Sequence, residues 1–242
     1  MTGHSCSQMC EHCMGRSLKG MLTPKNNGEL YEMLKNEKEV LLSGGNFNGR
    51  VPWYGFEGGI KDLKASGVKI AIHPGVIDAI DIEKLGSLRI DQVLVDFILD
   101  DGVLKSNYHA PYTSEDIKKM VELLLESRIE VVPHVLYGLE RTEKNKEEIR
   151  VLSDYGVKKL VLIFLVSDKK LENLENFLEF ARNNFENILA IGCMRGKERE
   201  KIDPKAVELG FERIVLPTRR AMKLAESMGY EIELRDGCCS FP

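Results

Sequence analysis

The stretch Glu39-Val40-Leu41-Leu42-Ser43-Gly44-Gly45-Asn46 introduces a pattern that runs through the whole chain. An apolar run of strand length ends in two glycines, which mark a turn. Similar runs recur along the sequence, and most are followed by an amphipathic segment. Continuous apolar strands that alternate with helices are typical of a parallel sheet covered by helices on its outer face. The runs predict strands at 39–43, 68–73, 92–99, 129–136, 159–166, 187–191, 213–216 and 231–234.

The intervening segments carry the helical period. In 114–127, Ile117, Met120, Val121 and Leu124 form one apolar stripe, and Thr113 or Ser114 is the expected N-cap. Helices are predicted at 29–36, 59–66, 81–88, 114–127, 144–154, 171–185, 204–209 and 219–228.

Eight strands with alternating helices predict an α/β fold, a parallel (β/α) barrel of the TIM type that is complete or partly open. A further strand should precede the first loop, but residues 1–4 leave room only for a shortened or vestigial one. No linker or low-complexity segment divides the chain, so residues 1–242 are expected to form a single domain. Residues 230–242 would be a C-terminal strand and a Cys-Cys-Ser tail that returns to the barrel mouth.

Composition narrows the classes of function. The 242 residues are 43% hydrophobic and 30% charged, and the net charge is −4. This balance argues against nucleic acid or a membrane surface as a partner, and no apolar run is long enough to span a membrane. The first residues lack the features of a signal peptide, so we expect a cytoplasmic protein. Six cysteines in that compartment indicate metal ligands and not disulfides.

Three of these cysteines, Cys6, Cys10 and Cys13, have the spacing C-x3-C-x2-C. Three thiolates on one short loop can bind three irons of a [4Fe–4S] cluster and leave the fourth iron for a small molecule. A zinc site is the alternative, and it needs a fourth ligand that His4 or His12 could supply.

The cysteine spacing resembles that of the radical S-adenosylmethionine (SAM) enzymes. The resemblance implies that the open iron chelates the amino and carboxylate groups of SAM. One electron from the cluster then cleaves SAM to a 5′-deoxyadenosyl radical.

Ser43-Gly44-Gly45-Asn46 resembles the "GGE" motif with which these enzymes bind the amino group of methionine. Glycines allow a ligand to approach the backbone closely. Asn46 stands where the motif has an acid, so a charge-assisted contact is not expected there. The alternative is an ordinary turn after a strand.

Three polar residues interrupt or end later strands, and active sites of such barrels lie at the C-terminal ends of strands. Asp96 is a carboxylate inside an apolar run, so it should face a polar partner: it could bind the SAM ribose or form a structural ion pair. His73 and His134 could contact SAM or substrate, or be hydrogen-bonded core residues. Residues 108–112 are expected to be a solvated loop.

The remaining cysteines are Cys193 and the adjacent pair Cys238 and Cys239. The barrel topology would bring them together at the mouth, where three thiolates and an oxygen, Ser240 or another, could hold an auxiliary [4Fe–4S] cluster. Buried, inert thiols are the alternative. Arg195 could bind an anionic group or form a structural salt bridge.

Together, the motifs resemble one subunit of the two-component lipoyl synthases found mainly in archaea. They are Thr2-Gly3-x2-Cys6-x3-Cys10-x-His12-Cys13, Leu18-x2-Met21, Leu42-Ser43-Gly44-Gly45, Val132-Pro133-His134, Gly192-Cys193-Met194-Arg195 and Asp236-Gly237-Cys238-Cys239. The resemblance implies sulfur insertion into a protein-bound octanoyl chain, with an auxiliary cluster as the sulfur donor. The implied partners are a second radical SAM subunit, the octanoylated lipoyl carrier protein and an electron donor such as ferredoxin.

Two other interpretations remain open from the residues. One is a radical SAM enzyme of another type, for methylation or rearrangement, with a second cluster. The other is a non-catalytic iron–sulfur or zinc protein.

Overall fold

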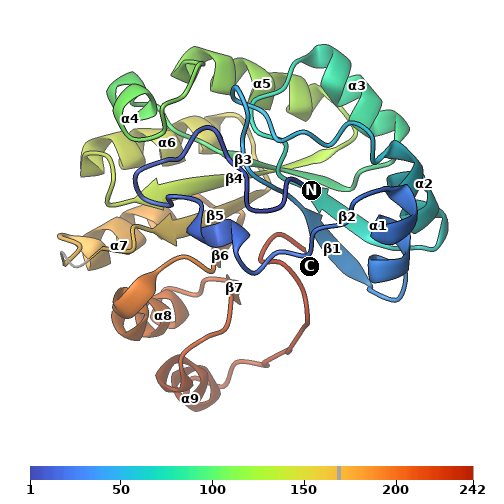
Figure 1. The fold of residues 1–242 in the computed structure, drawn as a ribbon. Coiled ribbons are helices and arrows are strands. Elements are labelled where there is room, and N and C mark those ends of the chain that lie inside the picture. The colour runs from blue at the N-terminus through green and yellow to red at the C-terminus, as the bar shows by residue number, and fades with distance from the viewer. Residues whose placement is uncertain (168–169, 242) are drawn as a thin grey trace. The chain divides into compact units, whose positions relative to one another are not determined.

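The strands of the computed structural model follow one another in the sheet in the order β1-β2-β3-β4-β5-β6-β7 (Figure 1). The structure describes residues 1–167 and 170–241. It divides the chain into two units, the first made of Met1–Val95 and Asp100–Val131 and the second of Asp96–Leu99 and Val132 onward. Strands and helices alternate, so the α/β fold class with a partly open, TIM-like parallel sheet is confirmed. The prediction of a single domain stays a prediction.

In the first unit, parallel pairing aligns the C-terminal ends of neighbouring strands. Residues of β1 and β2 pair from Glu39↔Lys69 to Leu42↔Ile72, and the His73 amide extends the pairing to the Leu42 carbonyl at 2.9 Å. Ser43–Asn46 and His73 therefore follow strands that end at the same edge. The elements up to α5 are η1 (Arg16–Leu18), α1 (Asn27–Leu34), β1 (Glu39–Leu42), α2 (Glu57–Ala65), β2 (Lys69–Ile72), α3 (Ala79–Ser87), β3 (Gln92–Asp96), α4 (Asp101–Ser106) and α5 (Ser114–Glu126).

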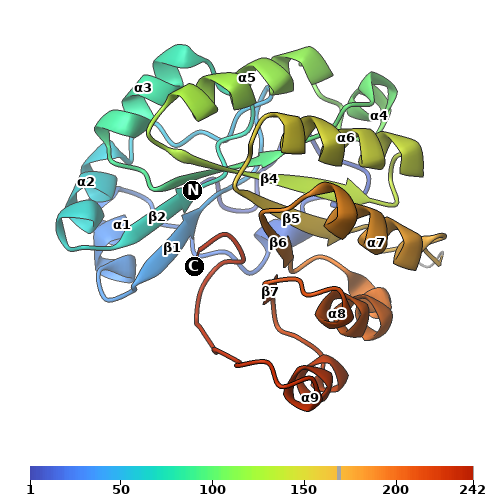
Figure 2. The same ribbon diagram turned by 180° about the vertical axis from the view of Figure 1, so that it is seen from behind.

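The second unit is built the same way, and α6, α7 and α8 lie side by side in it (Figure 2). His134 of β4 pairs with Val161 of β5, which pairs with Ala190 of β6. The remaining elements are β4 (Glu130–Tyr137), α6 (Thr142–Asp154), β5 (Lys159–Phe164), α7 (Leu174–Asn184), β6 (Ile188–Ile191), η2 (Gly196–Glu198), α8 (Arg199–Glu208), β7 (Arg213–Ile214) and α9 (Arg219–Ser227).

The helices bury the stripes that their sequences predict. Ile117, Met120, Val121 and Leu124 of α5 are buried, and Thr113 caps this helix in a capping box with Asp116. In α7 the buried side chains are Leu174, Phe177, Leu178 and Ala181. Full burial of one such side chain contributes roughly 1.5–3 kcal/mol, so these stripes hold the helices against their units.

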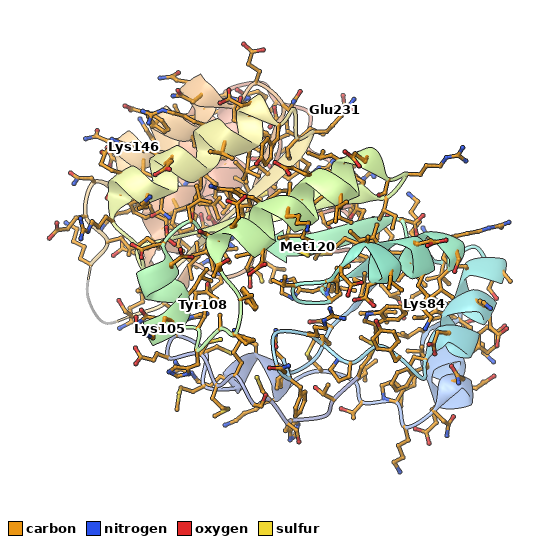
Figure 3. All side chains as sticks on the ribbon, turned by 90° about the horizontal axis from the view of Figure 1, so that it is seen from above. Lys84, Lys105, Tyr108, Met120, Lys146 and Glu231 are labelled. Carbon is orange, nitrogen blue, oxygen red and sulfur yellow. The ribbon has the colours of Figure 1, made fainter. Side chains whose placement is uncertain are left out.

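Four predictions for individual segments differ from the structure. Residues 231–234 are not a strand: Glu231, labelled in Figure 3, and Glu233 are exposed. Leu234 is 78% exposed, so the alternation buries no apolar face. Helix α8 begins before Pro204, and α4 forms where the sequence predicts no helix. At residues 1–4 there is no strand; the Met1 ammonium donates a hydrogen bond to the Ser43 carbonyl at 2.9 Å.

None of the helices within residues 1–167 and 170–241 has both the length and the apolar character needed to cross a membrane.

Candidate functional site

The cysteine loop is a series of tight turns in the first unit. The amides of Cys13 and Met14 both donate to the Cys10 carbonyl, at 3.0 and 2.8 Å. Met9 and Met14 have positive φ, which reverses the chain on either side of Cys10 and Cys13. Cys6, Cys10 and Cys13 form no disulfide and are of intermediate exposure, so all three remain accessible for ligation.

The segment Ser43–Asn46 forms the wall on which this loop rests. The Asn46 carbonyl accepts hydrogen bonds from the amides of Ser7 and Gln8, at 2.9 and 3.3 Å. The Asn46 amide donates to the Cys6 sulfur at 3.3 Å, and the Gly45 amide donates to the Thr2 hydroxyl at 2.5 Å.

Both glycines of this segment are required by contact with the N-terminal residues. A Cβ added to Gly45 would lie 1.8 Å from the Ser5 carbonyl oxygen, and one added to Gly44 would lie 2.8 Å from the Thr2 hydroxyl. Glycine at these two positions therefore leaves room for the cysteine loop of the same chain. The sequence alone indicates only a turn there.

A second wall comes from residues 107–112, where the expectation of a solvated loop holds for the exposed His109 but not for Tyr108, which is labelled in Figure 3 and 4% exposed. The Tyr108 ring contacts that of His12, with centroids 4.6 Å apart. The Tyr108 carbonyl accepts a hydrogen bond from the Cys10 thiol at 3.7 Å, and His109 Nδ1 contacts the Gln8 carbonyl at 2.9 Å. These residues hold the middle of the cysteine loop.

The donor set in this unit fits a [4Fe–4S] cluster with SAM. Burial raises the pKa of Cys13, but hydrogen bonds from the Ser17 hydroxyl and nearby amides outweigh it and lower that pKa. The Asn46 side-chain oxygen and the Gln8 side-chain oxygen are buried and have no hydrogen-bond partner among the described residues. Buried acceptors without a donor are costly, so both are suited to a ligand that carries N–H groups.

Within the described part of the chain, no three His, Cys, Asp or Glu side chains converge closely enough to hold one metal ion.

The second unit brings the other thiols together. The sulfurs of Cys238 and Cys239 are 3.9 Å apart, and the Cys239 sulfur is 4.0 Å from His134 Nε2. A hydrogen bond from the Cys239 thiol lowers the pKa of Cys238 to about 6, although burial opposes this. The same hydrogen bond, burial and the charges of Cys238 and Cys193 raise the pKa of Cys239.

The C-terminal tail reaches this position without the predicted strand. Lys159, at the start of β5, donates a hydrogen bond to the Ser240 carbonyl, and Arg213, at the start of β7, donates to the carbonyls of Ser240 and Phe241. Phe241 is 4% exposed and Ser240 is fully buried. Two cations thus hold the backbone of the tail within the second unit, close to the thiols that precede it.

The other predicted site residues have separate places. Arg195 is buried and forms a two-bond ion pair with Asp203, at 2.6 and 3.2 Å, and its Nη1 donates to the Gly192 carbonyl at 2.6 Å. This is the salt-bridge alternative left open by the sequence. Asp96 ends β3 and is half-buried in the second unit, and His73 is half-buried in the first.

No family model matches the sequence, and no curated protein matches it. Solved structures do match. Methylornithine synthase (PylB) has a TM-score of 0.66 at 14% identity, over 96% of this chain and 81% of that chain. HydG, a maturase of the [FeFe]-hydrogenase, has a TM-score of 0.63 at 14% identity, over 88% and 54%.

Streptococcus suis SuiB bound to SAM has a TM-score of 0.59 at 11% identity, over 88% of this chain and 48% of that chain. SuiB is also known with its precursor peptide SuiA bound. The chain thus spans about half the length of HydG and SuiB. The chain has the fold of these three proteins.

Proposed function

We propose that this protein is a radical SAM enzyme and, more specifically, one subunit of a two-component lipoyl synthase that inserts sulfur into a protein-bound octanoyl chain. The observation that carries the first part is the cysteine loop packed on Gly44, Gly45 and Asn46. Cys6, Cys10 and Cys13 are accessible there, and a buried acceptor of Asn46 lies beside them.

In this proposal Cys6, Cys10 and Cys13 hold the cluster, and the side-chain oxygen of Asn46 accepts a hydrogen bond from the SAM amino group. When bound, the reduced cluster and SAM supply a 5′-deoxyadenosyl radical. The chain's own task is to keep the loop in one conformation, which the amides of Ser7, Gln8 and Asn46 do through the contacts described above.

The sulfur-insertion part is supported by the gathering of Cys238 and Cys239 at His134 and by the motif resemblance. The proposed partners are a second radical SAM subunit, the octanoylated lipoyl carrier protein and an electron donor such as ferredoxin. Binding of a peptide by SuiB, a protein of the same fold, is in keeping with a protein-bound substrate.

The first part is tested by reconstituting the protein anaerobically with iron and sulfide, reducing it with dithionite and adding SAM. We expect 5′-deoxyadenosine from the parent protein and none from a variant in which Cys6, Cys10 and Cys13 are alanine. Absence of product from the fully loaded parent protein would overturn the proposal.

The second part is tested with an octanoylated carrier peptide and candidate partner subunits. Each sulfur that replaces a hydrogen as a thiol should add about 32 Da to the peptide. Formation of 5′-deoxyadenosine with a methylated or rearranged product and no added sulfur would assign the chain to another radical SAM reaction.

A further inference from the structure

The residue that faces the second group of thiols is a histidine whose orientation is fixed by the backbone. His134 lies in β4, where Nδ1 contacts the Val132 carbonyl at 3.2 Å. A carbonyl can only accept, so Nδ1 carries the proton and Nε2 presents its lone pair. A histidine that binds metal almost always donates its other ring N–H to a carbonyl or carboxylate in this way.

The lone pair of Nε2 points toward the tail thiols. The Cys239 sulfur is 4.0 Å away, which is the outer limit of a hydrogen bond to sulfur, and the Cys238 sulfur lies 3.9 Å beyond Cys239. Cys239 therefore lies beside both His134 and Cys238, without a tight bond to either.

The strand register brings Cys193 to the same place. His134 pairs with Val161, and a Cβ added to Gly192 would lie 3.0 Å from the Val161 side chain. The end of β6 thus passes close to Val161, next to His134, and Cys193 is the following residue.

Ser240, the oxygen donor expected from the sequence, has a different position. It is fully buried, and its carbonyl is bound by Lys159 and Arg213. Those contacts make Ser240 part of the anchor of the tail.

We propose that His134 Nε2, with Cys193, Cys238 and Cys239, completes the donor set of the second iron–sulfur cluster, in the position expected for Ser240. The inference rests on the proposed function, since it assumes that the second cluster exists. Imidazole ligands to iron–sulfur clusters are known from Rieske centres, where they raise the reduction potential. His134 is then a ligand of the second cluster and not a contact of SAM.

The test uses the full chain with Cys6, Cys10 and Cys13 changed to alanine, so that only the second site can bind iron. Histidine is labelled with ¹⁵N, the protein is reconstituted and reduced, and pulsed EPR measures the coupling of ¹⁵N to the cluster. We expect a directly coupled ¹⁵N signal, its loss in His134→Cys with iron retained, and no change in Ser240→Ala.

The outcomes separate the two proposals. If the triple variant binds no iron while His134 is intact, the second cluster is absent, and both the inference and the sulfur-insertion proposal are overturned. If it binds iron but shows no ¹⁵N coupling, or keeps the coupling in His134→Cys, the inference alone is overturned. The labelled protein with an unmodified His134 gives this answer even where His134 variants do not fold.

Discussion

Gly45 is the residue whose side chain, if it had one, would collide most directly with the cysteine loop. In Gly45→Ala the new methyl group would lie 1.8 Å from the Ser5 carbonyl oxygen, so the loop must move. We expect the iron bound at Cys6, Cys10 and Cys13 to fall severalfold. Gly86→Ala in α3 is the matched control, because a Cβ there meets nothing within 4 Å. Equal iron content in the two variants would contradict this role of Gly45.

Asn46 offers a test of SAM recognition that leaves the loop in place. Its backbone groups hold the loop, whereas its side-chain oxygen is buried without a partner among the described residues. A hydrogen bond to a charged group contributes about 1.5–3 kcal/mol, so Asn46→Ala should weaken SAM binding by about tenfold or more with iron content unchanged. Asn46→Asp restores a charged acceptor and should tighten binding. Equilibrium dialysis with labelled SAM measures both, and equal affinity in all three proteins would exclude the contact.

Glu148 links stability to pH. It is buried in α6, where its carboxylate accepts hydrogen bonds from the Leu99 amide at 3.0 Å and the Asn145 side chain at 2.9 Å. Burial, with the nearby charge of Glu140, raises the pKa of Glu148 well above its usual value of 4.5. Between the unfolded and folded pKa values the folded protein holds more protons, so its stability falls as pH rises through that window.

Glu148→Gln removes this proton linkage and should flatten the pH dependence. Urea unfolding of the metal-free protein between about pH 5 and about pH 8 measures it. We expect the unfolding free energy of Glu148→Gln to increase relative to that of the parent protein as the pH rises. A difference that does not change with pH would show that Glu148 ionises normally.

At the scale of elements, Asp203 joins three segments of the second unit. It pairs with Arg195 before η2 and accepts a hydrogen bond from the Thr218 amide, the N-cap of α9, at 2.8 Å. Removing one partner of a buried ion pair typically costs about 3–5 kcal/mol, so Asp203→Asn should lower the unfolding free energy by about that amount. Chemical denaturation of the metal-free protein checks this. A loss below about 1 kcal/mol would mean that the pair behaves as an exposed one.

The sequence predicts elements well where a periodic stripe is buried, as in α5 and α7. It fails where local chemistry competes with the pattern. Asp100 caps α4 by accepting from the amides of Gly102 and Val103, so a segment that reads as a turn becomes a helix. The sequence of residues 231–234 alternates as in a strand, but Leu234 is exposed in the structure. A local pattern cannot show whether a neighbouring strand is present to pair with such a segment.

For the candidate site, the sequence identifies the thiols but not the residues that hold them. Cys6, Cys10 and Cys13 stand out by spacing alone, whereas Tyr108 and His109 meet the loop only through the fold. The sequence feature that could have indicated these contacts is the tyrosine and histidine that follow the segment capped by Asp100. The position of the tail depends on Lys159 and Arg213, which lie far away in the sequence, so the local pattern of the tail does not reveal it.

At the scale of the whole molecule, each unit contains one group of three cysteines, and the six account for every cysteine in the chain. The first group packs on Gly45 and Asn46, and the second has a histidine and an anchored tail beside it. That both groups face one barrel mouth stays a prediction. If each group binds one [4Fe–4S] cluster, the reconstituted protein should contain about eight iron and eight sulfide ions per chain.

Iron counting on single variants then decides whether sulfur insertion has a donor. Cys193→Ala and Cys239→Ala should each lose about four irons, because a cluster held by fewer thiolates is not retained. Ser240→Ala should keep the parent content, since Lys159 and Arg213 bind its backbone carbonyl and not its side chain. If Cys193→Ala and Cys239→Ala keep all the iron of the parent, the tail thiols hold no cluster. The SAM cleavage proposed for the first unit would then be unaffected, but the proposed sulfur insertion would have no donor in this chain.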